Sequence, residues 1–174
     1  ASVLDAYCYL GGFGLLAAQA GATHVTLLDR SEPSLALAGE AAARNGLADR
    51  IATERGEVFE ALEAHARDKR RFDIVVIDPP AFAKSKKDLQ PALRGYRKLA
   101  RLAARVVAPG GFLLANSCSH TVDVANFTTE TTRGVFEAGR NARILRTTGA
   151  SPDHPTHPQL PESAYLKALL LNLD

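Results

Sequence analysis

The stretch DIVVIDPPAFAKSKK, residues 73–87, determines how the chain around it must fold. Residues 74–77 are Ile, Val, Val and Ile without helical period, which is typical of a deeply buried strand. Asp78 stands between that run and two prolines, and Phe82 follows. Proline cannot donate to a ladder of backbone hydrogen bonds, so the chain has to leave the sheet here. A turn requires neither this acid nor this aromatic, so we interpret the stretch as an active-site wall.

Similar runs along the chain predict the rest of the architecture. Four runs without helical period predict strands: SVLDAY (2–7), HVTLLD (24–29), FDIVVID (72–78) and GGFLLAN (110–116). The segments between them are typical of helices. This alternation predicts an α/β fold with a parallel sheet and helices on both faces, joined by right-handed crossovers. Ligands of such folds bind at the carboxyl ends of the strands.

Two helices are predicted in more detail. The first runs from about Pro33 to Asn45, with a cap at Ser31 or Glu32 and a stop at Asn45-Gly46. The second runs from about Leu89 to Ala108 and is closed by Pro109-Gly110-Gly111. Its apolar face comprises Leu93, Tyr96, Ala100, Ala103 and Val107.

The C-terminal part departs from the alternation. The predicted strands ARILRTTGA (142–150) and AYLKALLLNLD (164–174) are separated by a proline-rich segment. That segment is too short for a crossover helix, so we expect these two strands to pair antiparallel.

The composition indicates a chain of one globular domain. It has 174 residues, 46% hydrophobic and 23% charged, and no apolar run approaches the roughly 20 residues that cross a bilayer. The segment ASVLDAY (1–7) is a predicted strand and not a signal peptide, and methionine is absent. We therefore expect a cytoplasmic location and a fragment of a longer protein. Cys8 and Cys118 are expected to be free thiols.

The charge is unevenly distributed. A net charge of +2 does not by itself indicate a nucleic-acid-binding protein, but residues 84–105 contain a single acid, Asp88, and many basic residues. These are Lys84, Lys86, Lys87, Arg94, Arg97, Lys98, Arg101 and Arg105. They either solvate a helix or form a basic stripe for RNA phosphates.

Two strand ends carry residues suited to a nucleoside. The first predicted strand contains Asp5 and runs into a glycine turn from Gly11 to Gly14, where backbone N–H groups can approach a ligand. Asp29 ends the second strand, where an acid can bind ribose hydroxyls. A plain turn and a helix cap are the alternatives, and the glycine spacing is not G-x-G-x-x-G. Together these residues favour a nucleoside pocket and leave NAD open.

The residues after Asp78 favour a base with an amino group. Two prolines hold the backbone extended, so Asp78 can face a planar amino-bearing base and Phe82 can stack on it. The next strand ends in NSCSH (116–120), which places Cys118 at the edge of the same cleft. A cysteine after a buried strand can be an inert core residue, but this polar setting favours a nucleophile.

Five segments of the chain, in order, resemble the RlmI-type family of S-adenosylmethionine-dependent 23S rRNA cytosine-5 methyltransferases. They are VLDAYCYLGGFG (3–14), LLDRSEPSLALAGEAAARNGL (27–47), DIVVIDPPAFAKSKK (73–87), APGGFLLANSCSH (108–120) and DHPTHPQLPESAYLKALLL (153–171). The resemblance implies a Rossmann-like class I methyltransferase fold, with seven strands that are mostly parallel and an antiparallel last strand. It also implies ribosomal RNA as substrate, and RNA-binding domains ahead of the first strand. Residues 1–174 would then be the catalytic domain alone.

The resemblance also implies S-adenosylmethionine as cofactor. The Gly11 to Gly14 turn would lie beside its methionine part, Asp29 at its ribose and Glu57 at its adenine amino group. The family usually has Asp in place of Glu57, and Thr and Ser in place of Leu10 and Gly14, so we expect weakened affinity. The complete expected cofactor site comprises Asp5, Tyr7, Gly11, Gly12, Phe13, Asp29, Arg30, Ser31, Glu57, Val58 and Asp78.

Methylation at carbon 5 of cytosine requires a nucleophile at carbon 6, a role that we assign to Cys118. Asp78 would hydrogen-bond the ring nitrogen or amino edge and stabilise the adduct. Lys84 is the expected cation that lowers the pKa of the thiol, and Phe82 would meet the flipped base. The expected substrate site comprises Pro79, Pro80, Phe82, Lys84, Arg97 and Arg101.

Other functions fit the same residues. An acid before two prolines and an aromatic also serves methyltransferases of adenine or guanine amino groups, which need no covalent catalyst. The departures at Leu10, Gly14 and Glu57 would fit a noncatalytic nucleoside-binding or RNA-binding module. His154 and His157 have a spacing compatible with a metal site, but no third ligand is evident and we expect none. The oligomeric state is left open.

Overall fold

Strands and helices alternate along the chain in the computed structural model, which describes residues 1–83, 85–152 and 154–174, and only the backbone of residues 86 and 161. The strands are β1 (Ser2–Ala6), β2 (His24–Asp29), β3 (Ile51–Arg55), β4 (Phe72–Ile77), β5 (Val107–Ser117), β6 (Ala142–Thr148) and β7 (Lys167–Leu173). The helices are α1 (Gly12–Gln19), α2 (Glu32–Arg44), α3 (Val58–Arg67), α4 (Leu89–Ala104) and α5 (Val124–Glu137). Short 3-10 turns occur at Ala48–Arg50, Lys86–Asp88 and Pro161–Ser163.

The strands form one seven-stranded sheet in the order β3-β2-β1-β4-β5-β7-β6. All neighbours pair parallel except β7, which is antiparallel to both β5 and β6. The predicted mostly parallel sheet and its antiparallel last strand are therefore confirmed. The chain leaves β1 toward one edge and continues from β4 toward the other, so the strand order reverses between these neighbours. A crevice for ligands is expected outside their carboxyl ends.

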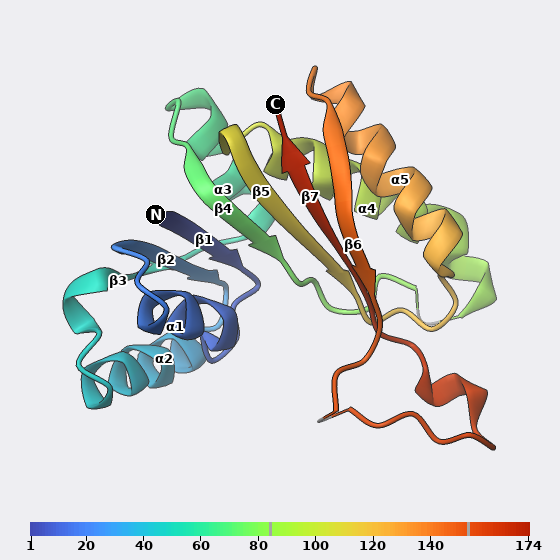
Figure 1. Cartoon of the computed structure of the whole chain (residues 1–174), viewed down its shortest axis with the longest axis horizontal. Helices are drawn as coiled ribbons and strands as arrows, with labels where there is room; N and C mark the ends of the chain where they lie inside the picture. Colours follow the sequence, from blue (N-terminus) through green and yellow to red (C-terminus); the bar gives the residue numbers. More distant parts are fainter. Residues whose placement is uncertain (84, 153) are drawn as a thin grey trace.

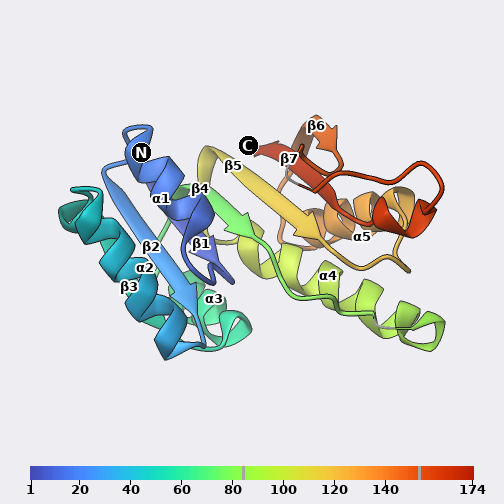
Figure 2. The same ribbon diagram turned by 90° about the horizontal axis from the view of Figure 1, so that it is seen from below.

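Helices cover both faces of the sheet, as the sequence predicts. Helices α1 and α2 lie on one face, and α3, α4 and α5 lie on the other (Figures 1 and 2). Alternation along β1 decides this division, because Val3 packs in the core with α1 and α2, whereas Leu4 and Ala6 pack in the core with the other three. The carboxyl ends of the parallel strands point toward the side on which the β6–β7 loop projects (Figure 1).

Helix α2 has the termini that its sequence predicts. The Ser31 hydroxyl accepts a hydrogen bond from the Ser34 N–H at 3.3 Å, and Pro33 lies in the first turn. Asn45 is the C-cap and Gly46 follows at φ +67°, a conformation that favours glycine. The two helix ends thus define the connection between β2 and β3.

Helix α4 ends earlier than the prediction of Ala108, because its last helical residue is Ala104. Val106 and Val107 are fully buried, and the Val106 carbonyl accepts a hydrogen bond from the Phe72 N–H at 2.8 Å. Val107 begins β5, and residues 109–111 lie inside that strand, where the register shifts. Burial of two valines against β4 therefore outweighs the Pro-Gly-Gly signal, which marks an irregular strand and not the helix end.

Strand β3 was not predicted as a separate strand from its residues. Its sequence IATER contains one large apolar side chain, Ile51, and most of the strand is exposed at the edge of the sheet. An edge strand needs no continuous apolar run, so its signal was absent. In the part of the chain that the structure describes, no helix is both long and apolar enough to span a membrane.

Candidate functional site

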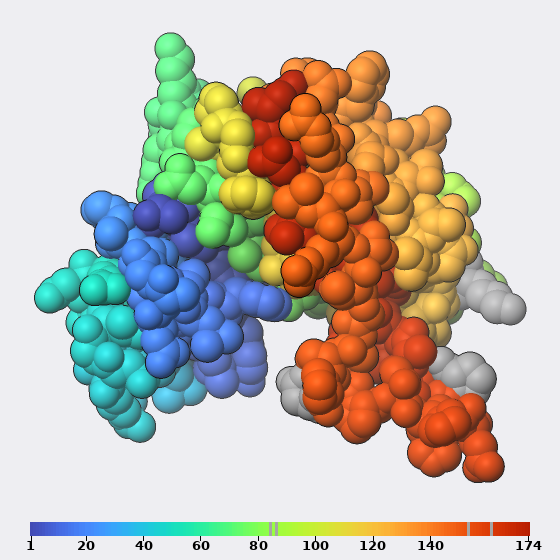
Figure 3. Space-filling view, viewed as in Figure 1, coloured from blue at the N-terminus to red at the C-terminus, as the bar shows by residue number. Residues whose placement is uncertain are grey.

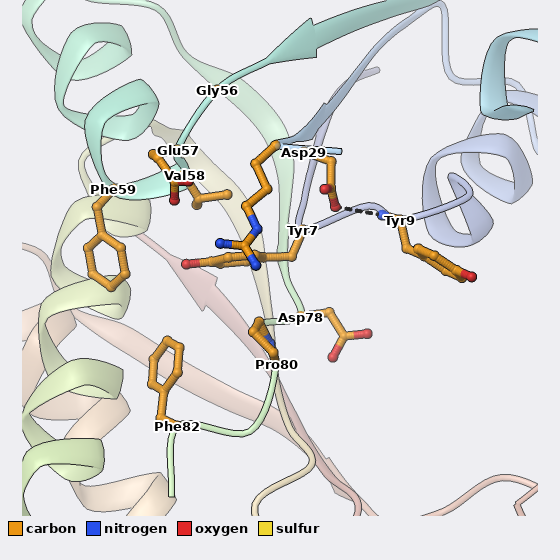
Figure 4. Close-up of a pocket in the computed structure, with 11 residues that line it drawn as sticks. Tyr7, Tyr9, Asp29, Gly56, Glu57, Val58, Phe59, Asp78, Pro80 and Phe82 are labelled. Carbon is orange, nitrogen blue, oxygen red and sulfur yellow. Dashed lines mark hydrogen bonds between the residues drawn. The ribbon is translucent and has the colours of Figure 1, made fainter. Parts of the chain in front are cut away.

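A cavity of about 470 Å³ lies beside the carboxyl ends of β1, β2 and β4 and the start of α3. Four loops that each follow a strand contribute to its wall, as expected at a reversal of strand order. Its lining residues are Tyr7, Tyr9, Asp29, Arg30, Gly56, Glu57, Val58, Phe59, Asp78, Pro80 and Phe82 (Figure 4). We call it the first cavity.

The carboxylate of Asp29 is held in place by two backbone groups. The Tyr9 N–H donates to Oδ2 and the Ser31 N–H donates to Oδ1, each at 2.9 Å (Figure 4). A carboxylate oxygen can accept more than one hydrogen bond, so both oxygens keep capacity for further donors. Asp29 therefore presents two oriented acceptors to the first cavity, as a pair of ribose hydroxyls requires.

The turn between β1 and α1 has an unusual backbone. Tyr7 and Tyr9 have φ values of 62° and 49°, and Gly11 has a φ of 80°. Positive φ is uncommon for tyrosine and is often found at functional sites. A Cβ at Gly11 would also lie 3.0 Å from a methyl group of Leu27. Close packing on β2 thus shapes the turn, which brings Tyr7 and Tyr9 to the cavity.

Asp5 lies beneath this turn, fully buried. Its Oδ2 accepts a hydrogen bond from the Gly14 N–H at 2.8 Å. Burial raises the pKa of Asp5 to about 6, although the hydrogen bond opposes the shift. A Cβ at Gly14 would lie 2.2 Å from a methyl group of Leu27, so no side chain fits there. The missing serine hydroxyl at Gly14 therefore has a packing reason, and Asp5 supports the turn without lining the cavity.

The opposite wall of the first cavity is apolar and aromatic. Phe59 and Phe82 lie on the side away from Asp29, with ring centroids 6.4 Å apart (Figure 4). Val58 begins α3, and Glu57 is its N-cap residue without a side-chain capping bond, so the carboxylate is available at the cavity. This wall suits a planar base. The structure places Phe82 in the lining of this cavity, whereas we expected it to meet the target base.

A second cavity of about 330 Å³ lies beside the ends of β5 and β7. Its lining residues are Phe13, Asp78, Asn116, Ser117, Gly149, Ser151, His154, Leu166, Lys167 and Ala168. Figure 3 shows the surface hollowed between the α1 and α2 region, in blue and cyan, and the projecting β6–β7 loop, in orange and red. Asp78 lines both cavities, so they meet at this residue.

Cys118 follows β5 and is half-buried, and it comes directly after Ser117, which lines the second cavity. Its Sγ lies 3.8 Å from the Pro79 carbonyl oxygen, so the thiol adjoins the double proline. The serines on both sides of it bond the same hydroxyl: Ser117 Oγ lies 2.9 Å and Ser119 Oγ 2.8 Å from the hydroxyl oxygen of Tyr96. The sequence placed Tyr96 only on the apolar face of α4. Its hydroxyl on a buried helix face was the available signal, because such a group needs partners.

Burial controls the ionisation of the groups around Cys118. Burial raises the pKa of Asp78, and a hydrogen bond from Asn116 opposes this. Burial also raises the pKa of the Cys118 thiol, the Asp78 carboxylate raises it further, and the Lys167 ammonium lowers it. Burial and the Asp78 carboxylate therefore both disfavour the thiolate of Cys118 in the free protein. Lys84, the cation that we expected here, lies outside the described residues.

Cys8 has a different setting from Cys118. It is buried in the core between the sheet and helices α1 and α2. Burial, followed by the nearby Asp5 carboxylate, raises the pKa of Cys8 to about 12. It is a packing residue, and both cysteines are free thiols as expected.

Several predicted site residues lie outside both cavities. Gly11 and Gly12 shape the turn and the start of α1, and Ser31 caps α2, whereas Phe13 reaches the second cavity. Pro79 is buried and contributes its carbonyl beside Cys118. Sequence reasoning did not single out Tyr9, Phe59 or Asn116, which line the cavities.

The basic residues of α4 are not gathered at either cavity. Arg97 pairs with Glu130 and Glu137 of α5, the latter at 3.6 Å, so its charge contributes to helix packing. Arg101, one helical turn further, is half-buried. The helices are close here, since a Cβ at Gly134 would lie 2.3 Å from the Arg97 carbonyl oxygen.

No three His, Cys, Asp or Glu side chains are grouped to hold a metal ion within residues 1–83, 85–152 and 154–174. His157 instead organises its own loop, since its Nδ1 accepts a hydrogen bond from the Gln159 N–H at 3.2 Å.

Comparison with known proteins identifies similar chains. A family described as S-adenosylmethionine-dependent methyltransferase matches residues 1–172. Two curated relatives are named "Ribosomal RNA large subunit methyltransferase I". The relative from Aeromonas hydrophila is 40% identical over 171 residues, and the relative from Vibrio cholerae is 39% identical over 168. The matches cover 97% and 95% of this chain but only 43% and 42% of the relatives, so the chain spans less than half of their length.

Solved structures agree with these relatives. A methyltransferase crystallised in complex with SAH is 25% identical, with a TM-score of 0.84 over 98% of this chain and 44% of that chain. A structure described as an S-adenosylmethionine-dependent methyltransferase from Streptococcus mutans has the same identity and coverage, with a TM-score of 0.83.

Proposed function

The chain belongs to the S-adenosylmethionine-dependent methyltransferase family, and from this premise we propose that it methylates carbon 5 of a cytosine in ribosomal RNA. The observation that carries the proposal is that Asp78 lines two cavities at once. One cavity has the walls of a nucleoside site, and the other is lined by Asn116 and Ser117, the two residues immediately before Cys118. A methyl donor and a target base could therefore meet at one carboxylate.

The residues of the first cavity fit S-adenosylmethionine. Its volume of about 470 Å³ falls in the range of roughly 300–1,000 Å³ that is usual for ligand sites. Phe59, Phe82 and Val58 would hold the adenine, Asp29 the ribose hydroxyls and Glu57 the adenine amino group. The bound cofactor supplies a methyl group on a positively charged sulfur. The chain's own contribution is to orient the adenosine and to place Asp78 at the reacting end.

The second cavity would hold the target cytosine. The Cys118 thiol would lose its proton to water, and its sulfur would form a bond to carbon 6 while the electron pair of the ring double bond moves to carbon 5. Carbon 5 would then take the methyl group that the cofactor supplies, and the electron pair of the broken methyl–sulfur bond would stay with the donor sulfur. A base then removes the proton from carbon 5, the double bond re-forms and the bond from sulfur to carbon 6 breaks. Asp78 would hydrogen-bond the ring nitrogen or the amino edge during these steps. The carboxylate oxygens of Asp78 can accept a hydrogen bond from the amino group of the base.

We further propose that RNA binding depends on parts of the protein outside these 174 residues. Arg101 and the exposed basic residues of α4 would contact RNA phosphates, whereas Arg97 is occupied by α5. A ribosomal RNA substrate would place the activity in the cytoplasm.

The experiment compares Cys118→Ala with Cys8→Ala in the full-length protein. Methyl transfer to ribosomal RNA and binding of S-adenosylhomocysteine are measured for both. We expect Cys118→Ala to abolish transfer and to keep the binding, and Cys8→Ala to keep both. Transfer by Cys118→Ala would contradict the covalent mechanism.

A second function is favoured by one observation. Burial raises the pKa of the Cys118 thiol, which disfavours the thiolate, and an acid before Pro79 and Pro80 also suits methylation of an adenine or guanine amino group, which needs no thiolate. RNA containing 5-fluorocytosine separates the two functions. A covalent adduct of the protein with that RNA supports cytosine-5 transfer, whereas methyl transfer without an adduct supports the amino-group enzyme.

A further inference from the structure

Lys167 is a buried cation beside Cys118 to which the sequence assigned no role. It begins β7 and is 5% exposed. In the antiparallel pairing of β7 with β5, its register partner is Ser117. The last strand therefore carries an ammonium group to the strand end where the nucleophile follows.

Two backbone carbonyls fix the ammonium of Lys167. Its Nζ donates to the Ser119 carbonyl oxygen at 2.7 Å and to the Tyr165 carbonyl oxygen at 2.8 Å. An ammonium has three N–H donors, so these two bonds leave capacity for one more partner. Because Lys167 also lines the second cavity with Asp78 and Asn116, that partner can be a group inside the cavity.

Placing this charge in the interior is costly. A buried ammonium group loses its hydration and is normally compensated by a paired anion. Among the described residues, no carboxylate lies within ion-pair distance of the Lys167 Nζ. Burial lowers the pKa of Lys167, and the two groups that oppose this shift are Cys118 and Asp123. The Nζ bonds the carbonyl of Ser119, the residue directly after Cys118, so the ammonium lies near the sulfur that becomes anionic in the proposed reaction.

We propose that Lys167 is the positioning residue that stabilises the thiolate of Cys118, the role that the sequence led us to expect of Lys84. The inference rests on the proposed function. When the S–H bond breaks, its proton passes to water, and the electron pair stays on sulfur beside the fixed ammonium. That pair then forms the bond to carbon 6, and it returns to sulfur when the bond breaks. Two carbonyl bonds hold the cation in place throughout the cycle.

The competing explanation is structural. Lys167 would then only tie the Ser119 and Tyr165 carbonyls together, and its charge would have no effect on Cys118. Lys167→Gln separates these explanations, because its amide can still donate to a carbonyl but carries no charge. Lys167→Met removes both the charge and the donors at similar side-chain length.

The test measures the pH at which Cys118 reaches half of its maximal rate of alkylation by iodoacetamide, read from the mass of the intact chain. Cys8→Ala is introduced first, so that one thiol remains. We expect Lys167→Met and Lys167→Gln to raise this midpoint by about one pH unit or more. The matched control is Lys69→Met, an exposed lysine in the turn after α3, and its midpoint should equal that of the parent.

An unchanged midpoint in either Lys167 variant, with circular dichroism like that of the parent, would overturn the inference. If Lys167→Met does not fold, Lys167→Gln decides, since it keeps a donor for the two carbonyls. The midpoint requires neither RNA nor cofactor, so it is independent of the proposed function. Methyl transfer by Cys118→Ala would refute that function even where the midpoint shifts as expected.

Discussion

The two cavities that meet at Asp78 are built in different ways. The first is assembled from short loops after consecutive parallel strands, and its polar lining combines the carboxylates of Asp29 and Glu57 with Arg30, Tyr7 and Tyr9. The second is assembled around β5 and β7, which are far apart in sequence, and it contains the ammonium of Lys167. The first thus offers anions to hydroxyl and amino groups, and the second offers a cation to a sulfur anion. Asp78 is the residue that both cavities share. The substitutions below test whether each cavity can be altered without affecting the other.

Asp78→Asn should have the largest effect, because it acts on both sides. We expect methyl transfer to ribosomal RNA to fall about 100-fold to 1,000-fold, as when a stabilising group is removed from an active site. The alkylation midpoint of Cys118 should move down, since the Asp78 carboxylate raises the pKa of that thiol. Kinetics of the full-length protein measure the first effect. Asp49→Asn, an exposed carboxylate before β3, is the control, and equal rates for the two variants would contradict the assignment.

Asp29→Ala should affect the first cavity alone. Losing hydrogen bonds to a charged group costs about 2 kcal/mol, which corresponds to about 30-fold weaker binding of S-adenosylhomocysteine. Calorimetric titration measures the affinity. The affinity of Asp29→Asn should lie between those of Asp29→Ala and the parent, because asparagine keeps an acceptor for a backbone N–H. The alkylation midpoint of Cys118 should not move. A midpoint shift as large as that of the Lys167 variants would show that a change in the first cavity also alters Cys118.

Asp5→Asn should stabilise the turn that serves the first cavity. The pKa of Asp5 is about 6 in the folded chain and about 3.9 in an unfolded one, so between these values only the folded state holds the proton. The free energy of unfolding of the parent therefore falls as pH rises through this window and stays lower above it. We expect the variant to gain on the order of 2 kcal/mol at pH 7.5 and little at pH 4. Urea unfolding at both pH values measures this, and an equal gain at both would refute the titration of Asp5.

Tyr96→Phe should weaken the second cavity alone. It removes the hydroxyl shared by Ser117 and Ser119, at a cost of about 1 kcal/mol of stability. Methyl transfer should fall about 10-fold, because looser serines misplace Cys118 between them. Binding of S-adenosylhomocysteine should stay unchanged. Tyr165→Phe is the matched control, and a comparable loss of transfer in it would remove the special role of Tyr96.

Glu57→Asp should have the smallest effect. Glu57 is the N-cap residue of α3 without a side-chain capping bond, and aspartate is a better N-cap. We expect the free energy of unfolding to rise by about 0.5 kcal/mol and the affinity for S-adenosylhomocysteine to change less than about 3-fold. A larger loss of affinity would show that the longer side chain is required at the adenine amino group.

The acids of the first cavity could be predicted because they stand at the ends of strands, whereas Tyr9 and Phe59 were not predicted. Asp29 and Asp78 end apolar runs, and parallel neighbours bring such ends together whatever the details of packing. The directions of the side chains could be predicted less well from the sequence. Phe82 follows two prolines, and only its packing on Tyr96, at 4.7 Å between ring centroids, turns it toward the first cavity.

Residues of the second cavity were partly hidden because their neighbours are distant in sequence. Cys118 was predicted as a nucleophile from its polar surroundings after β5. Tyr96 looked like an ordinary apolar face residue, and Lys167 lies in the apolar run of β7 without a local signal for a partner. Helix α4 also ended early, because burial of Val106 and Val107 against β4 is a long-range effect.

The sequence by itself determined the alternation of strands and helices, the antiparallel last strand and the acids at the strand ends, since these follow from local periodicity and from what proline and glycine allow. The tertiary structure alone decided that Asp78 joins two cavities and that Lys167 stands opposite Ser117. The physical reason is that register between strands is set by burial over the whole sheet. A shift by one residue would turn Lys167 to the other face and remove the ammonium from Cys118.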